Sequence, residues 1–111
     1  MQFTIREYMT PQEQKDKTRR YLNDTGMDIF ITILYPALKK SFDIDFNDVC
    51  SMFPEYAERV KSDRSKRTRL SKAKSILRNG WEKYALTIIS ESNRLDEQLI
   101  NKAKEYLATI Y

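Results

Sequence analysis

The most constraining feature of this sequence is an apolar segment at residues 27–42, MDIFITILYPALKKSF. If this segment is helical, five apolar side chains form one stripe along it: Met27, Phe30, Ile31, Leu34 and Leu38. Three more lie beside that stripe: Ile29, Ile33 and Ala37. A helix that is apolar nearly all round has to be covered by other elements on most sides. We therefore expect this segment to be the central element of a bundle.

The run IFITI at residues 29–33 is also typical of a buried strand, because periodicity cannot separate the two structures over so short a run. For residues 29–34 we favour the helix and keep the strand as the alternative. Two glycines and three prolines in 111 residues leave little of the turn chemistry that a sheet of many strands requires. Pro36 is expected to kink or interrupt the helix.

Capping signals define a helix near the N-terminus. Thr10 is a suitable N-cap, Pro11 suits the first helical position, and Glu13 can close a capping box. The helix that they open runs through about residue 22. Its residues are polar until Tyr21 and Leu22, so we expect it on the outside of the protein.

Similar signals divide the rest of the chain. Asp45 or Asn47 caps a helix that Pro54 splits, and Gly80 ends a basic helix after residue 78. An amphipathic pattern predicts a helix over residues 81–90, and Asp96 caps the last one. We expect an all-α fold, a compact bundle of five to six short helices, in a single basic helical domain spanning residues 1–111. Residues 2–9 form a short strand or an extended arm in this prediction.

The lack of histidine and the single cysteine restrict the chemistry of the chain. Disulfide frameworks, zinc sites of the usual spacing and histidine-based catalysis are excluded within one chain. Cys50 lies on an apolar pattern and has no histidine to activate it, so we expect a small core residue. Trp81 heads an apolar stripe and is expected in the core rather than as an exposed platform for a base. We predict that the protein is not an enzyme and uses no cofactor.

An acidic cluster is formed by Asp43, Asp45, Asn47 and Asp48. A calcium loop of the EF-hand type starting at its first residue would need Gly at the sixth place and Glu at the twelfth. The sequence has Asp48 and Pro54 there, so the match fails. We interpret the cluster as capping and solvation and assign no metal site. A nuclease working through carboxylates and a divalent metal is the enzymatic alternative.

No stretch of the sequence is long and apolar enough for a bilayer span, which needs about 20 residues. The longest apolar run, at residues 29–38, is interrupted by Thr32 and Pro36. The N-terminus has no apolar run after a basic start. We expect a cytoplasmic protein in a reducing compartment, with no membrane partner.

Positive charge is concentrated in one part of the chain. Residues 59–78 carry nine Lys and Arg against Asp63 alone, a local charge of +8 in a chain of net charge +4. Within them, residues 64–78 read RSKRTRLSKAKSILR, with seven basic residues and no acidic one. Such a block indicates a directed electrostatic surface rather than general solubility.

A helical projection sorts residues 64–78 into two sides. The core side carries Leu70, Ala73, Ile76 and Leu77. The opposite side carries four cations and two hydroxyl groups: Arg64, Arg67, Ser71, Lys74, Ser75 and Arg78. Lys72 flanks that side, whereas Lys66 and Arg69 point toward the core and would have to snorkel or lie in an irregular first turn.

This pattern predicts a small non-enzymatic protein that binds the phosphate backbone of DNA or RNA. Cations neutralise phosphate oxygens, and small hydroxyl groups donate hydrogen bonds to them. No carboxylate lies between Asp63 and Glu82 to relieve the repulsion along the helix, so a polyanion would relieve it. The candidate nucleic-acid-binding residues are Arg64, Lys66, Arg67, Arg69, Ser71, Lys72, Lys74, Ser75 and Arg78.

Two other interpretations stay open. The basic side is either a solvated surface only or a docking site for an acidic protein surface, on an accessory subunit or inhibitor of a replication, transcription or defence enzyme. A second basic group, Lys15, Lys17, Arg19 and Arg20, serves solubility or extends the basic surface. In composition the chain resembles small accessory proteins of phages and mobile elements, which favours an accessory or regulatory role. Homo-oligomers and heteromeric complexes are both compatible with the sequence.

Overall fold

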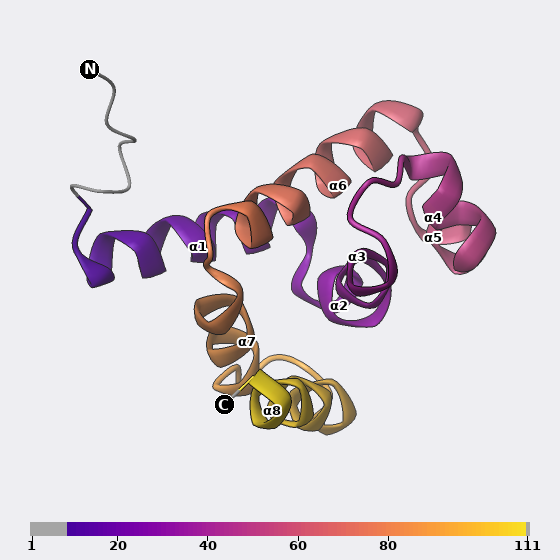
Figure 1. Ribbon diagram of the computed structural model, residues 1–111. Helices are drawn as coiled ribbons and strands as arrows, with labels where there is room; N and C mark the ends of the chain where they lie inside the picture. Colours follow the sequence, from indigo (N-terminus) through magenta and orange to yellow (C-terminus); the bar gives the residue numbers. More distant parts are fainter. Residues whose placement is uncertain (1–8, 111) are drawn as a thin grey trace, which may run out of the picture.

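The computed structural model describes residues 9–110, and every regular element in that range is helical (Figure 1). In chain order the elements are α1 (Pro11–Thr25), α2 (Met27–Ile29), the π-helical segment η2 (Phe30–Leu34), α3 (Tyr35–Lys40), α4 (Phe46–Met52), α5 (Glu55–Arg59), α6 (Asp63–Arg78), α7 (Glu82–Ser90) and α8 (Glu97–Ile110). The expected all-α fold is confirmed. The strand or arm expected over residues 2–9 lies outside the described residues, apart from Met9.

Helix α1 begins where the sequence predicts. Thr10 Oγ1 accepts the backbone N–H of Glu13 at 3.1 Å, and the Glu13 carboxylate accepts that of Thr10 at 2.9 Å. The helix runs three residues further than expected and ends at Gly26, whose φ of 91° favours glycine. One side of α1 is buried, and it consists of Thr18, Leu22 and Thr25. The rest of α1 is exposed or half-buried, so the helix lies on the outside of the protein as expected, with this narrow side packed against α6 and α7.

The apolar segment is helical throughout and lies at the centre of the core. Phe30, Ile31, Ile33 and Leu34 are 0% exposed. The helical interpretation of residues 29–34 is thus confirmed against the strand.

Pro36 interrupts the α-helical hydrogen bonding without ending the helix. Just before it the pattern widens to that of a π-helix, in which the N–H of Tyr35 donates to the carbonyl of Phe30. Proline has no N–H, so the carbonyl four residues earlier lacks its α-helical donor at this turn in any case. The wider turn therefore falls where the α-helical ladder is already incomplete.

Tyr35 joins the central segment to α7 and α8. Its hydroxyl donates a hydrogen bond to the carboxylate of Glu82, and its ring meets that of Tyr106 edge to face at 4.7 Å between centroids. Lys39 Nζ lies 3.5 Å from the same carboxylate. Burial, followed by the hydrogen bond and the negative charge of Glu82, raises the pKa of Tyr35 well above its usual value.

Helices α4 and α5 are separated at Pro54, as predicted. Tyr56 of α5 is fully buried, and its hydroxyl donates to the carbonyl of Lys66 in α6 at 2.8 Å. Burial raises the pKa of Tyr56 to about 12. Arg59 pairs with Asp28 of α2. These contacts attach the short helices to both α2 and α6.

The turn between α6 and α7 also follows the prediction. Gly80 has a φ of 76°, and the next residue, Trp81, is 2% exposed. The indole N–H of Trp81 donates to Gln14 Oε1 at 3.2 Å, and its ring lies 5.8 Å from that of Tyr21. Trp81 is therefore a core residue that ties α7 to α1.

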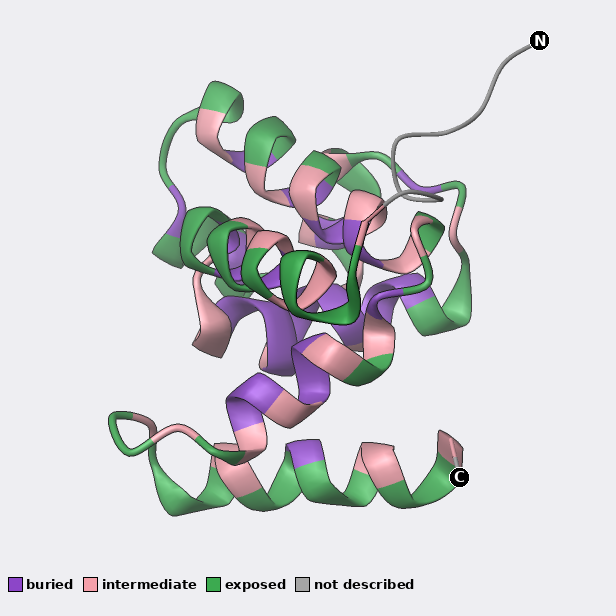
Figure 2. Cartoon of the chain, turned by 90° about the vertical axis from the view of Figure 1, so that its left-hand side faces the viewer, coloured by how far each residue is buried: buried purple, intermediate pink, exposed green. Residues whose placement is uncertain are grey.

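The buried residues gather into one core in the middle of the molecule, as the burial colours show (Figure 2). Helix α8 packs on α7 at the end of the molecule opposite α6, with only Ala103 of its residues fully buried (Figure 1). Cys50 is half-buried and packs against the core. Within residues 9–110, no helix has both the length and the apolar character needed to cross a bilayer.

Candidate nucleic-acid interface

Helix α6 is fixed by a cap and by one apolar side. Ser62 Oγ accepts the backbone N–H of Ser65 at 3.0 Å, which makes it the N-cap. The residues that the projection turned toward the core are buried or half-buried: Leu70, Ala73 and Ile76 fully, and Leu77 partly. Because one side of α6 is held in the core, the opposite side faces outward.

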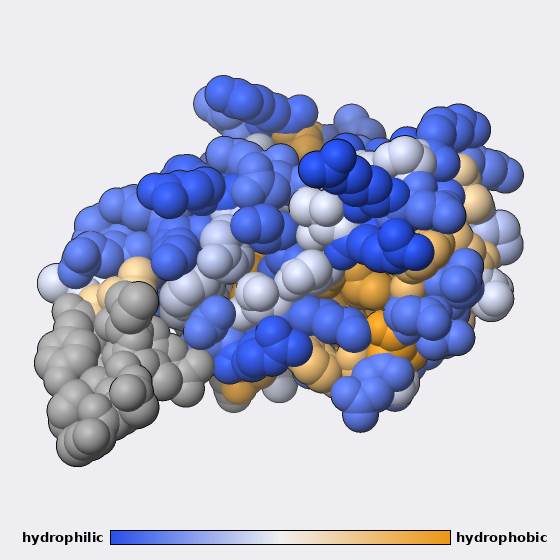
Figure 3. Space-filling view, turned by 90° about the horizontal axis from the view of Figure 1, so that it is seen from above, coloured by the Kyte–Doolittle hydropathy of each residue, from blue (hydrophilic) through white to orange (hydrophobic). Residues whose placement is uncertain are grey.

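We call this opposite side the basic face; it consists of Arg64, Arg67, Ser71, Lys74, Ser75 and Arg78. The three arginines and Ser71 are exposed, and the other two residues are half-buried. At a rise of about 1.5 Å per residue, the basic face extends over about 21 Å of α6. Hydrophilic residues cover most of the surface seen from above, with hydrophobic residues showing between them toward the right (Figure 3).

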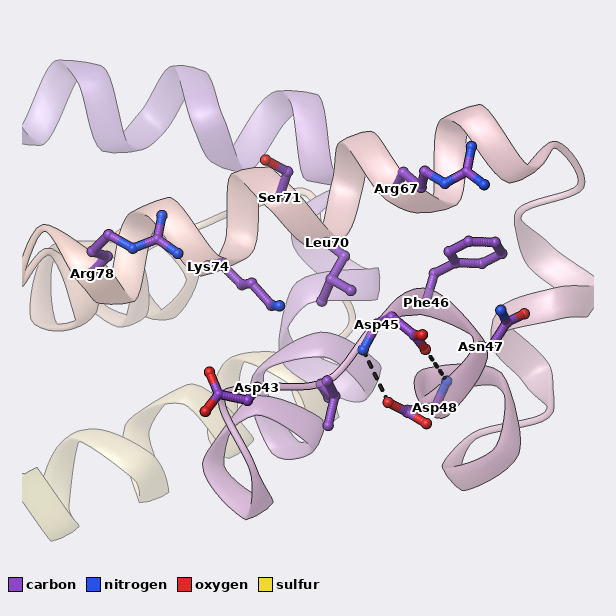
Figure 4. Close-up of a pocket in the computed structure, with 11 residues that line it drawn as sticks. Asp43, Asp45, Phe46, Asn47, Asp48, Arg67, Leu70, Ser71, Lys74 and Arg78 are labelled. Atoms are coloured by element: carbon purple, nitrogen blue, oxygen red, sulfur yellow. Dashed lines mark hydrogen bonds between the residues drawn. The ribbon is translucent and has the colours of Figure 1, made fainter.

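A groove of about 780 Å³ lies between the basic face and the acidic link, by which we mean residues 41–48. Helix α6 lines it with Arg67, Leu70, Ser71, Lys74 and Arg78, and the link lines it with Asp43, Ile44, Asp45, Phe46, Asn47 and Asp48. In Figure 4, Lys74 and Leu70 point from α6 toward the link, and Phe46 points back toward Arg67. Segments some 30 residues apart in the sequence thus form one open site.

Two aromatic rings of the link lie under cations of the basic face. The guanidinium carbon of Arg67 is 4.9 Å from the ring centroid of Phe46. Lys74 Nζ is 5.7 Å, and the guanidinium carbon of Arg78 5.4 Å, from that of Phe42. Such contacts are attractive by about 0.5–1 kcal/mol at exposed sites, so the rings hold the cations near the groove.

The carboxylates of the link are partly engaged in capping, as the sequence indicated. Asp45 Oδ1 accepts the N–H of Asp48 at 2.9 Å, and Asp48 Oδ2 accepts the N–H of Asp45 at 3.1 Å (Figure 4). No group of three or more Asp, Glu or Cys side chains within residues 9–110 is arranged to hold a metal ion.

Three of the candidate binding residues, Lys66, Lys72 and Arg69, do not line the groove and have partners in other parts of the protein. Lys66 is buried, with Nζ 3.3 Å from the carbonyl of Lys61 and 3.4 Å from Asp63. Lys72 lies over the ring of Tyr21 at 4.5 Å and 3.9 Å from Asp24. These contacts place Lys72 beside α1 rather than in the groove.

Arg69 makes the third internal contact. Its Nη1 donates to the carbonyl of Thr25 at 2.8 Å, and its Nε donates to Ser65 Oγ at 3.1 Å. The first of these bonds joins α6 to the end of α1. The helical projection predicts that Lys66 and Arg69 point toward the core. In the structure each donates a hydrogen bond to a backbone carbonyl, Lys66 to that of Lys61 and Arg69 to that of Thr25.

Phe42 and Phe46 are not among the residues that the sequence predicted for this site, although both contact its cations. Both lie beside the acidic cluster, and an aromatic residue next to a charged link is a weak signal for a binding site. The second basic group is on α1, where Arg19 and Arg20 are exposed and Lys15 and Lys17 half-buried. None of the four lines the groove.

The chain was also compared with known proteins. No protein-family model matches it, and neither does any curated protein or solved structure.

Proposed function

We propose that this protein is a non-enzymatic nucleic-acid-binding protein that contacts the phosphate backbone of DNA or RNA through the basic face. The observation that supports this proposal best is the exposure of Arg64, Arg67 and Arg78 along one side of α6. Within residues 9–110, Arg67 and Lys74 form no ion pair with a carboxylate. Their charge is therefore still available to a polyanion.

Ser71 and Ser75 complete the set, because hydroxyl groups between cations donate hydrogen bonds to phosphate oxygens. We leave Lys66 and Arg69 out of the proposed contacts, since both already bond to carbonyl groups within the protein. Lys72 lies at the margin of the surface. Four cations that neutralise four phosphates predict a slope of about −3.6 for log K against log salt on duplex DNA.

The test compares two triple charge reversals of equal size. R67E/K74E/R78E changes the basic face, whereas R94E/K102E/K104E changes cations on and before α8, at the opposite end of the molecule. We expect the first variant to weaken binding to DNA or RNA at low salt by roughly a hundredfold, and the second by much less. Equal losses would mean that only net charge matters, and the proposal would then be wrong.

A second candidate function is a protein-interaction module, an accessory subunit or inhibitor of a replication, transcription or defence enzyme. Half-buried apolar side chains on and directly after α4, whose first residues line the groove, favour it: Phe46, Cys50, Met52 and Phe53. This candidate predicts that the isolated chain binds no nucleic acid at low salt. It also predicts that a stoichiometric acidic partner co-purifies with the wild-type chain and is lost with R67E/K74E/R78E.

A further inference from the structure

We infer that the groove binds single-stranded nucleic acid, with the phosphates on the α6 wall and a base against the acidic link. This inference rests on the proposed function and specifies its ligand. The two walls differ in charge: Arg67, Lys74 and Arg78 on one side oppose Asp43, Asp45 and Asp48 on the other. A ligand that fits both walls must carry an anionic group and a hydrogen-bond donor, as a nucleotide does.

The shape of the site favours an unpaired strand. A volume of about 780 Å³ lies within the range of about 300–1,000 Å³ typical of sites for small molecules. A single base with its sugar and phosphate fits such a space. In a duplex, each base is stacked on both sides and its pairing edge is occupied, so it cannot enter without unpairing.

The apolar surface between the walls suits a base. Of the apolar residues that line the groove, Ile44 and Leu70 are buried, whereas Phe46 is half-buried and supplies the accessible apolar surface. Bases of single strands stack on aromatic rings and on arginine guanidinium groups. The guanidinium carbon of Arg67 lies 4.9 Å from the ring centroid of Phe46, too close for a base between them, so a base would stack on the outer face of this pair.

The acidic wall sets the orientation of the strand. Carboxylates repel phosphates, so the backbone stays on α6, but they accept hydrogen bonds from exocyclic amino groups such as N4 of cytosine. Asp45 and Asp48 each use one oxygen for a backbone N–H, and a carboxylate has further acceptor sites. Thymine has no amino group, so cytosine should be preferred over thymine.

The experiment measures fluorescence anisotropy of labelled 12-mers (oligo-dC, oligo-rC, oligo-dT and a DNA duplex) with the full chain at fixed low salt. We expect the preferred oligo-C, DNA or RNA, to bind at least about fivefold more tightly than the duplex and than oligo-dT. Phe46→Leu should weaken the binding of oligo-C by about fivefold or more, and by a larger factor than it weakens the binding of the duplex. Phe53→Leu is the matched control, because Phe53 is half-buried near α4 but does not line the groove.

A second variant tests the acidic wall. D43N/D45N should reduce the preference for oligo-C over oligo-dT, and asparagine at position 45 preserves the N-cap of α4. Equal affinity for single strand and duplex, unchanged by Phe46→Leu but lost with R67E/K74E/R78E, overturns this inference and leaves the proposed function intact. If no nucleic acid binds at low salt, the proposed function fails as well.

Discussion

Both sides of α6 carry lysine and arginine, but the cations of one side are hydrogen-bonded within the protein and those of the other side face the groove. On the inner side, Lys66 and Arg69 bond to backbone carbonyls of other segments. On the basic face, Arg67 and Lys74 lie over aromatic rings and keep their hydrogen-bonding capacity. The number of cations in the sequence therefore exceeds the number that a candidate binding surface can use. The position of each cation on the helix decides whether it already stabilises the fold.

The largest loss of stability is expected from Arg69→Met. The change keeps an apolar stem but removes the 2.8 Å hydrogen bond to the Thr25 carbonyl. Hydrogen bonds from charged donors contribute about 1.5–3 kcal/mol, so the free energy of unfolding in urea should fall by about 2–3 kcal/mol. Arg67→Met is the control on the basic face and should cost less than about 0.5 kcal/mol. Equal losses would remove the distinction between the two sides.

Gly26→Ala tests the same inner contact from α1. A Cβ at position 26 would lie 3.0 Å from Arg69 Nη1, and the φ of 91° is strained for alanine, so we expect a loss of about 2 kcal/mol. Gly80→Ala is the matched control: its φ is also positive, but nothing lies within 4 Å, so only about 1 kcal/mol should be lost. In an Arg69→Met background the loss from Gly26→Ala should shrink, which a double-mutant cycle measures.

Tyr56→Phe removes the hydrogen bond to the Lys66 carbonyl and should cost about 1 kcal/mol at neutral pH. The pKa of Tyr56 rises from 10.0 to about 12 on folding, so the folded state retains the proton more strongly. The contribution of the Tyr56 hydroxyl to the free energy of unfolding is therefore fully present below pH 10 and is lost as the pH rises through about 12.

The difference in unfolding free energy between the wild type and Tyr56→Phe should therefore be constant from pH 7 to 9 and shrink above pH 10. Urea titrations at each pH measure it. Because all other groups titrate in both proteins, they cancel in the difference. An unchanged difference at pH 11 would contradict the role assigned to Tyr56.

The smallest effect on stability is expected on the basic face. R67Q/K74Q/R78Q removes the contacts over Phe42 and Phe46 but also relieves the repulsion between Lys74 and Arg78. The two terms offset each other, so the free energy of unfolding should change by no more than about 0.5 kcal/mol. A loss above about 1.5 kcal/mol would show that the basic face is structural.

Local chemistry accounts for the parts of the fold that the sequence predicted. The caps at Thr10 and Asp45, the break at Pro54 and the turn at Gly80 each depend on a few neighbouring residues. The helical projection of residues 64–78 also needed only local geometry. For that reason it separated the buried Leu70 from the exposed Arg67 correctly.

Contacts between segments that are distant in the sequence could not be predicted. Nothing around Phe46 indicates that it lies below Arg67, because that neighbourhood depends on how α4 packs on α6. The buried side of α1 was missed for a similar reason, since Thr18 and Thr25 are polar residues that packing against α6 and α7 covers. The groove also results from such packing. The sequence shows the acidic cluster and the basic segment, but it does not show that they face each other across the groove.

The π-helical turn before Pro36 also sets the tolerance of the chain to length changes. A π-turn holds about one residue more than an α-turn, so deleting one residue within Phe30–Leu34 would let a regular α-helix form there. The α-turn covers about the same rotation with one residue fewer, so the residues that follow would keep their orientation relative to α2. The ring and hydroxyl of Tyr35 would still face Glu82 and Tyr106. A single-residue deletion in this turn should therefore preserve the register of α3, whereas a deletion in a purely α-helical stretch such as α1 or α6 would rotate the residues after it by about 100°.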